Sequence, residues 1–293
     1  MSLCRQLQVA AIHISEGDLE YELPSIEGSE FDGLYKDFDT MQTKLRETTE
    51  ERNRADALTK EVIGNISHDL KTPLTAIKGY AEGIMDGVAA TPERMERYVK
   101  TIHSKAVDMA GLVDELSYFT KIYQKVEDFR FAPVKASYFF AECISGMSLD
   151  LETRNIQLLY QCDVGEDVEI VIDEEKIKRV VANIVGNAVK YIQREQGMIL
   201  VNVEDQGPFI QVMIRDNGKG IGKEELPFIF ERFYRTDSSR NSRTGGSGLG
   251  LAIAKKIMDE HGGRIWAESE LGKGTEVYFT LKKETEQKEE HDE

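Results

Sequence analysis

The first half of the chain spaces its apolar residues alternately by three and four positions. Between residues 31 and 45 these are Phe31, Leu34, Phe38, Met41 and Leu45. The spacing predicts a helix with a coiled-coil seam, because it keeps one narrow apolar stripe facing a partner helix. A shorter helix with similar spacing is predicted over residues 3–14, and a linker containing Pro24 and Gly28 separates the two. Spacing alone is equally compatible with a generic helical hairpin.

A second pair of apolar seams follows. One runs through Leu58, Val62, Ile66, Leu70, Leu74, Ile77, Ala81, Ile84 and Val88, and the other through Met95, Val99, Ile102, Ala106, Met109, Val113 and Leu116. A turn over residues 86–91 is expected between them, with Thr91 as the N-cap and Pro92 as the first helical residue. The pattern predicts an antiparallel helical hairpin. Because two narrow seams leave apolar surface uncovered, dimerisation into a four-helix bundle is expected.

His68 stands between the seam residues Ile66 and Leu70. It is therefore expected about 200° round the helix from each, facing solvent. Pro73 lies inside the same helix and tends to kink it. A neighbouring carboxylate, as Asp69 provides, can orient an imidazole and take a proton from it. A single histidine beside an acid is more often an ordinary solvated residue, and that interpretation is given to His13, His103, His261 and His291.

Beyond residue 129 the pattern changes to short alternating segments mixed with helices. Residues 156–162, 198–204 and 209–215 alternate as strands do, and an α+β sandwich is predicted. Three glycine-rich turns lie at residues 216–221, 245–251 and 272–275, and the second opens a predicted helix. Such a turn can hold phosphate, although a flexible loop is the plain alternative. Neither a Walker A loop nor a Rossmann pattern fits.

Asn183 and Asn187 lie one helical turn apart, with Lys190 nearby, on an otherwise apolar helix. Mg²⁺ prefers oxygen ligands and keeps several waters, so an amide oxygen together with triphosphate oxygens would make a reasonable site. A polar surface face is the alternative interpretation.

Composition narrows the classes of function. Acidic residues number 53 against 37 basic ones, for a net charge of −16, which disfavours nucleic acid as a partner. Cys4, Cys143 and Cys162 form no Cys-x-x-Cys pair, which argues against a disulfide framework or a zinc site. No apolar stretch reaches the roughly 20 residues that span a bilayer, and no secretory signal is expected. The acidic tail is expected to be solvated and disordered.

Five motifs, in order, resemble those of the sensor histidine kinases of two-component systems. Residues 67–74 look like the H box of a HisKA-type dimerisation and histidine-phosphotransfer domain. Residues 183–191, 216–221, 228–235 and 246–251 look like the N, G1, F and G2 boxes of the GHKL (Bergerat) ATP-binding fold. The N-terminal seam pair resembles a HAMP relay domain, with residues 16–19 closing its first helix.

The resemblance implies a multidomain chain. Residues 1–50 would be a HAMP-like relay, and residues 51–127 the dimerisation and phosphotransfer hairpin. Both are all-α and belong to a coiled-coil or four-helix-bundle dimer. Residues 128–283 would be an α+β sandwich of the GHKL ATPase type, followed by the acidic tail at residues 284–293.

The resemblance also implies roles for single residues. His68 would be the phosphoacceptor, Asp69 its general base, and Thr72 the residue that positions water for phosphatase activity. Asn187 would coordinate Mg²⁺ with support from Asn183. Asp216 would accept the adenine amino group. The remaining implied ATP-binding residues are Lys190, Tyr191, Gly218, Gly220, Ile221, Arg232, Arg235, Gly246, Ser247, Gly248, Leu249, Gly250, Leu251 and Thr275, with a mobile lid over roughly residues 228–247.

The function implied is that of a protein-histidine kinase. With ATP and Mg²⁺ it would autophosphorylate His68, pass the phosphoryl group to an aspartate of a response regulator receiver domain, and also act as the regulator's phosphatase. A homodimer is implied, as the cytoplasmic portion of a cell-membrane protein. Two alternatives stay open: a GHKL ATPase without phosphohistidine, and a non-catalytic dimeric relay scaffold. The hairpin with His68 argues against the first, and intact Asn187 and Asp216 argue against the second.

Overall fold

The computed structural model of the chain describes residues 3–15, 18–21, 32–123, 128–192, 195–235 and 247–284. These residues belong to two compact units, Met1–His68 and Asp69–Glu293, which are treated separately below. None of the described helices combines the length and the hydropathy needed to cross a membrane.

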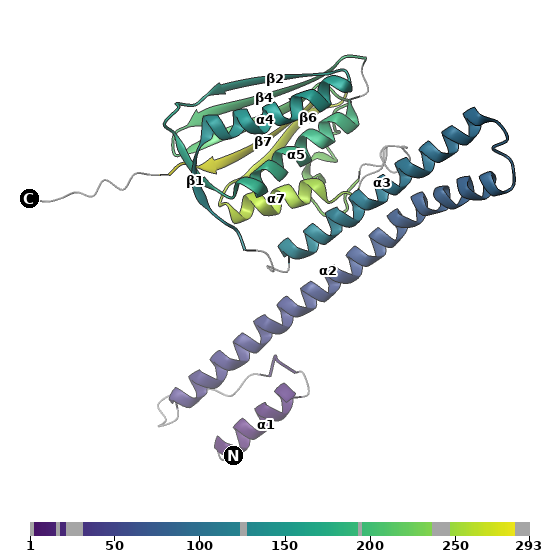
Figure 1. Cartoon of the computed structure of the whole chain (residues 1–293). Coiled ribbons are helices and arrows are strands. Elements are labelled where there is room, and N and C mark those ends of the chain that lie inside the picture. The colour runs from purple at the N-terminus through teal and green to yellow at the C-terminus, as the bar shows by residue number, and fades with distance from the viewer. Residues whose placement is uncertain are drawn as a thin grey trace, which may run out of the picture. The chain divides into compact units, whose positions relative to one another are not determined.

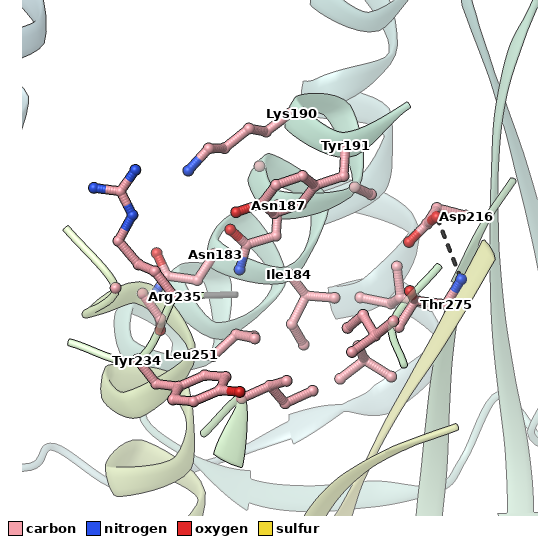
Figure 2. Close-up of a pocket in the computed structure, with 18 of the residues that line it drawn as sticks. Asn183, Ile184, Asn187, Lys190, Tyr191, Asp216, Tyr234, Arg235, Leu251 and Thr275 are labelled. Atoms are coloured by element: carbon pink, nitrogen blue, oxygen red, sulfur yellow. Dashed lines mark hydrogen bonds between the residues drawn. The ribbon is translucent and has the colours of Figure 1, made fainter. Parts of the chain in front are cut away.

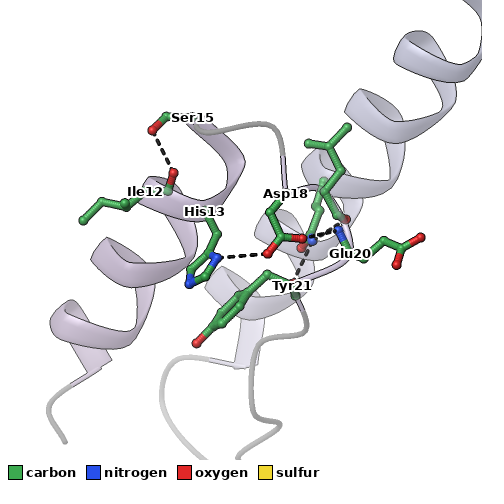
Figure 3. Close-up of polar contacts among 8 residues, drawn as sticks. Ile12, His13, Ser15, Asp18, Glu20 and Tyr21 are labelled. Atoms are coloured by element: carbon green, nitrogen blue, oxygen red, sulfur yellow. Dashed lines mark hydrogen bonds and ion pairs between the residues drawn. The ribbon is translucent and has the colours of Figure 1, made fainter. Parts of the chain in front are cut away.

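The first unit holds α1 (Leu3–Ser15) and the beginning of α2 (Asp32–Met85). Figure 3 shows the polar contacts at the end of α1. The His13 Nδ1 atom lies 3.0 Å from Asp18 Oδ2, and its ring stacks on Tyr21 with centroids 4.2 Å apart. Gln42 donates from its amide to the carbonyls of Leu19 and Tyr21, each at 2.8 Å. These bonds hold residues 18–21 against α2. The expected linker residues Pro24 and Gly28 lie outside the described residues.

Helix α2 runs without a break through residue 50 and through Pro73. The predicted domain boundary between residues 50 and 51 therefore falls inside one helix. Its seam residues Leu34, Met41 and Leu74 are exposed in the single chain, as expected for a helix that needs a partner. Phe31 and the side chains of Leu58 and Val62 lie outside the described part of the seam.

The predicted turn between the hairpin helices is confirmed. Helix α3 (Pro92–Tyr123) begins at Pro92, and the Thr91 hydroxyl accepts the Arg94 N–H at 3.3 Å as its N-cap. The rings of Tyr80 on α2 and Tyr98 on α3 meet edge to face with centroids 4.9 Å apart. The two helices therefore pack side by side as a hairpin (Figure 1).

The rest of the second unit is an α+β sandwich, as predicted. Its main sheet has the strand order β2 (Ile156–Asp163), β4 (Gly197–Gln206), β5 (Phe209–Asp216), β7 (Gly274–Lys282) and β6 (Ile265–Glu270). β2 and β4 are parallel and the other neighbours are antiparallel. A small sheet pairs β1 (Ala132–Lys135) with β3 (Glu169–Ile172). The strands predicted at residues 156–162, 198–204 and 209–215 are confirmed.

Only one face of the main sheet is fully buried. Every second residue of β4, β5 and β7 is inaccessible, among them Val201, Val212 and Phe279. Helices α4 (Ala136–Thr153), α5 (Glu174–Tyr191) and α7 (Gly250–Glu260) cover that face (Figure 1). Phe140 of α4 packs on Phe279 with ring centroids 6.3 Å apart. The apolar core of the second unit therefore lies between the sheet and these helices.

A buried aspartate joins three segments at one end of this layer. Asp173 caps α5 by accepting the Lys176 N–H at 3.2 Å, and it also accepts the Arg130 N–H at 2.9 Å. Its own N–H donates to His261 Nε2 at the end of α7, at 3.0 Å. His261 Nδ1 lies 2.8 Å from the Ile257 carbonyl, so the imidazole is neutral with its proton on Nδ1.

The expectation that His261 is an ordinary solvated histidine is wrong. Its ring packs edge-on against Phe129 and Phe131, with centroids 5.6 and 5.0 Å away. Burial lowers the pKa of His261, and the hydrogen bond to Ile257 opposes that effect. The aromatic partners lie about 130 positions earlier in the chain, so no local pattern marks this histidine as structural.

Acid is predicted to destabilise the second unit through His261. Unfolding returns the imidazole to an ordinary pKa of about 6.5, above its folded value, so the unfolded chain binds the proton more tightly. The stabilisation is therefore complete above about pH 6.5 and is lost as the pH falls through the folded pKa. Denaturant unfolding measured against pH checks this. In His261→Gln the free energy of unfolding should fall less steeply as the pH is lowered. His103→Gln, at an exposed position of α3, should keep the wild-type pH dependence. Equal pH dependence in all three proteins would contradict the assignment.

Candidate functional site

A cavity of about 370 Å³ lies in the second unit beside α5, the start of α7 and the ends of β5 and β7. Figure 2 shows its principal side chains. It gathers residues from all three glycine-rich turns and from the asparagine helix. The predicted residues that line it are Asn183, Asn187, Lys190, Tyr191, Asp216, Gly220, Ile221, Arg235, Ser247, Gly248, Gly250, Leu251 and Thr275.

Asp216 forms one end of the cavity. It closes β5, and its Oδ1 atom accepts the backbone N–H groups of Gly218 at 2.7 Å and Thr275 at 3.3 Å. Burial raises the pKa of Asp216, and these two hydrogen bonds oppose the rise. The described residues give its second oxygen no hydrogen bond, so that oxygen is available to an N–H donor in the cavity. Ile184 and Ile214 supply apolar wall beside it.

The turn after Asp216 contains two glycines whose backbone lies too close to neighbouring atoms for a side chain to fit. Gly220 has φ of +69°, and a Cβ there would lie 2.1 Å from the Glu270 carbonyl oxygen. Gly218 does not line the cavity, and a Cβ there would lie 2.7 Å from Asp216 Oδ1 and 2.8 Å from the Tyr191 carbonyl oxygen. Gly220 therefore lines the carboxylate end of the cavity, whereas Gly218 packs against Asp216 without lining it.

Cations mark the other end of the cavity. Figure 2 shows Lys190, Asn187 and Arg235 away from Asp216. Burial lowers the pKa of Lys190, the Arg235 guanidinium lowers it further, and the Glu115 carboxylate opposes both. The first turn of α7 also borders this cavity, and helix N-termini favour negative charge. The site therefore suits a ligand with two parts. One part is a flat ring with an N–H donor for Asp216, and the other is an anionic group that faces the cations.

The two asparagines have different surroundings. Asn183 donates from its amide to the Gly250 carbonyl at 2.8 Å, which ties α5 to the start of α7. Asn187 lies one turn further along and faces the cavity (Figure 2). Among the described residues no group of three or more His, Cys, Asp or Glu could hold a metal. An amide oxygen of Asn187 fits Mg²⁺ only together with oxygens of an anionic ligand and of water.

The loop before α7 is tied to its neighbours by Ser247 and Gly248. The Ser247 hydroxyl accepts the Leu249 N–H at 3.0 Å and donates to the Glu115 carboxylate. Gly248 has φ of +71° and accepts the Phe233 N–H at 3.1 Å. Leu249 is fully buried in the core and does not line the cavity. Gly246 and lid residues 236–246 lie outside the described residues.

The predicted hairpin residues are only partly described. Asp69 lies 3.9 Å from Arg235, and both side chains are mostly buried, at 23% and 19% exposed. Thr72 is exposed on α2. His68 belongs to α2, but its side chain lies outside the described part. Arg232 does not line the cavity; it lies over the Tyr123 ring, 5.3 Å from its centroid.

Several cavity residues were missed in the sequence. Lys219 lies over the Tyr191 ring, 4.8 Å from its centroid, and its place between two predicted glycines could have indicated it. Tyr234 lies inside the F box, so that motif could have indicated it. Leu271 directly precedes the third glycine-rich turn and carries no local signal of its own. Glu115 comes from α3, and no sequence pattern links it to the cavity.

Two family models match the chain. Residues 59–124 match the His Kinase A (phospho-acceptor) domain, and residues 172–285 match the Histidine kinase-, DNA gyrase B-, and HSP90-like ATPase. The chain is 33% identical over 245 residues to the Sensor histidine kinase WalK of Bacillus subtilis (strain 168), covering 83% of this chain and 40% of the relative. It is 35% identical over 268 residues to the Sensor histidine kinase YkoH of the same strain, covering 89% and 55%.

This chain belongs to the sensor histidine kinase family.

The chain spans about half the length of the curated relatives it matches, at 40% and 55%. Among solved structures it is similar to histidine kinase ThkA in complex with response regulator protein TrrA, with a TM-score of 0.65 and 27% identity, covering 82% of this chain and 66% of that one. The ATPase domain of this family binds ATP, and the described residues that line the cavity belong to that domain except for Glu115 of α3. Neither family model reaches residues 1–58, so the HAMP-like relay stays a prediction.

Gly220→Ala is predicted to destabilise the ATPase domain. An alanine would meet the Glu270 carbonyl and would have to keep a positive φ, which costs roughly 1–2 kcal/mol before the clash is counted. We expect a loss of at least about 2 kcal/mol in the free energy of unfolding, measured by denaturant titration. Gly222→Ala is the matched control, because its Cβ would have only ordinary contacts. Equal stability of the two variants would contradict the assigned role of the turn.

Proposed function

We propose that this kinase uses ATP and Mg²⁺ to phosphorylate its own His68 and then passes the phosphoryl group to an aspartate of a response regulator. One observation carries the proposal. Arg235, which lines the cavity, lies 3.9 Å from Asp69, the residue that follows His68 in the chain. The nucleotide site and the carboxylate of the H box thus share an ion pair, which neither a stand-alone ATPase nor a passive scaffold requires.

In this proposal one end of the cavity binds the adenine and the other end binds the phosphates. The free oxygen of Asp216 accepts the amino group of adenine, and the apolar wall of Ile184 and Ile214 takes the flat ring. Lys190, Arg235 and the first turn of α7 face the triphosphate. When bound, Mg²⁺ supplies charge neutralisation at the phosphate oxygens, with Asn187 as the oxygen ligand from the protein.

In the phosphoryl transfer, one imidazole nitrogen of His68 attacks the γ-phosphorus. The new P–N bond forms as the bond to the β–γ bridging oxygen breaks, and ADP leaves with that electron pair. Asp69 takes the proton from the other ring nitrogen as positive charge develops on the ring. Arg235 and Lys190 stabilise the negative charge on the phosphate groups. The phosphoramidate then serves as donor to the aspartate of the regulator.

Partners follow from the same reasoning. The similarity to a kinase and response regulator complex supports a receiver domain as the acceptor. Exposed Thr72 can orient water for the reverse, phosphatase reaction. Exposed seam residues on the hairpin, such as Leu74, Val99 and Val113, support a homodimer through a four-helix bundle. We place the chain in the cytoplasmic part of a membrane sensor, with residues 1–50 as its relay.

Autophosphorylation is predicted to depend on His68. Incubation with γ-labelled ATP and Mg²⁺ should give an acid-labile label on the wild-type chain and none on His68→Gln, because glutamine lacks a nucleophilic ring nitrogen. His103→Gln, at an exposed position of α3, should label normally. Label that survives in His68→Gln would contradict the assignment. ATP hydrolysis without label would favour the ATPase alternative, and no ATP binding would favour the scaffold.

Asp216→Asn is predicted to change the preferred base. Its amide oxygen can keep the bonds from Gly218 and Thr275, so its NH₂ group would face the amino group of adenine, donor against donor. Binding of ATP should weaken about tenfold or more. Inosine triphosphate presents a carbonyl at that position, so its affinity for the variant should rise relative to that of ATP. Calorimetric titration of both nucleotides checks this, with exposed Asp205→Asn as the control; an unchanged preference would contradict the role of Asp216.

A further inference from the structure

Helix α3 docks on the ATPase domain within the second unit. Phe119 and Ile122 of α3 are each only 2% exposed, and the Phe119 ring lies 6.2 Å from that of Phe233, centroid to centroid. On α5, the Arg179 guanidinium lies over the Tyr118 ring at 3.6 Å. These contacts fix which residues of α3 reach the cavity.

Glu115 is the residue of α3 that reaches the cavity. It lies one helical turn before Phe119, on the same face of the helix, and it lines the cavity. Its carboxylate accepts the hydroxyl proton of Ser247. Ser247 is 5% exposed, and its oxygen already accepts the Leu249 N–H at the start of α7. A hydroxyl has one proton to donate. Because Ser247 donates that proton to Glu115, it has none left for another acceptor.

The charge of Glu115 acts at the cationic end of the same cavity. Burial lowers the pKa of Lys190 and so does Arg235, whereas Glu115 raises it. The second cation, Arg235, lies 3.9 Å from another carboxylate of the hairpin, that of Asp69. Two hairpin carboxylates therefore interact with the groups that would meet the nucleotide phosphates.

We propose that Glu115 is a displaceable substitute for nucleotide phosphate, so that the polyphosphate of a nucleotide and the docked Glu115 compete for Ser247 and the cationic end of the cavity. The inference rests on the proposed ATP binding. A phosphate oxygen cannot share the single Ser247 proton with Glu115, and two negative groups in a partly buried site repel each other. By linkage, polyphosphate binding weakens the Glu115 contact by the same factor by which that contact weakens polyphosphate binding. Phe119 and Tyr118 carry no charge, so their contacts are not part of this competition.

The test compares affinities of the full chain for two probes. Mg²⁺ with a non-hydrolysable ATP analogue (AMP-PNP) carries the polyphosphate, and adenosine does not. In calorimetric titration, Glu115→Ala should bind the analogue about fivefold tighter or more and adenosine equally well. Glu115→Gln, which keeps the shape and removes the charge, should show part of the gain, and that part should shrink with added salt. Asp114→Asn, an exposed neighbour on α3, removes one charge from the same helix and should match wild type.

The outcomes separate this inference from the function it rests on. If Glu115→Ala binds the analogue no tighter than wild type, or binds it more weakly, Glu115 does not compete with phosphate. An equal gain for adenosine would also overturn the inference, because it would indicate general opening of the cavity. A wild-type chain that binds neither probe would contradict the proposed ATP binding itself.

Discussion

The sheet of the second unit can bury only one of its faces, and the remaining arrangement depends on that constraint. Alternating residues of β4, β5 and β7 are fully buried on the side covered by α4, α5 and α7. Because all three helices must lie on that one side, α5 and the start of α7 become neighbours of the ends of β5 and β7. The cavity forms where they adjoin, and it combines the asparagines of α5 with Asp216 at the end of β5.

Within that cavity, backbone geometry supports the charged groups. Asp216 stays buried because two N–H groups from different turns bond the same oxygen, leaving the other for a ligand. The cationic end has the opposite character, with Lys190 and Arg235 near a helix N-terminus. In the function proposed above, a site with a hydrogen-bond acceptor at one end and positive charge at the other would orient an adenine nucleotide with its phosphates toward the cations.

Docking of α3 gives the hairpin a direct connection to this site. The same helix face carries the apolar contacts of Phe119 and the carboxylate of Glu115. Apolar contacts are indifferent to a bound polyphosphate, whereas a carboxylate is not. The competition proposed for Glu115 would therefore couple nucleotide binding to the strength of the contact between α3 and the ATPase domain. It would not require α3 and the ATPase domain to separate.

The sequence by itself determined the elements and most of the site. Seam spacing, the Thr91 cap and strand alternation are local properties, set by helix and strand periodicity, and the structure confirms the turn and the strands built on them. The glycine-rich turns and the asparagine helix likewise identified most of the described residues that line the cavity. Tertiary structure alone decided the rest. Leu249 lies in the core, Asn183 bonds Gly250, and His261 is half-buried against two phenylalanines. Glu115 lines the cavity from a helix distant in sequence. Those outcomes depend on which faces of separate elements meet, and no spacing within one segment encodes that.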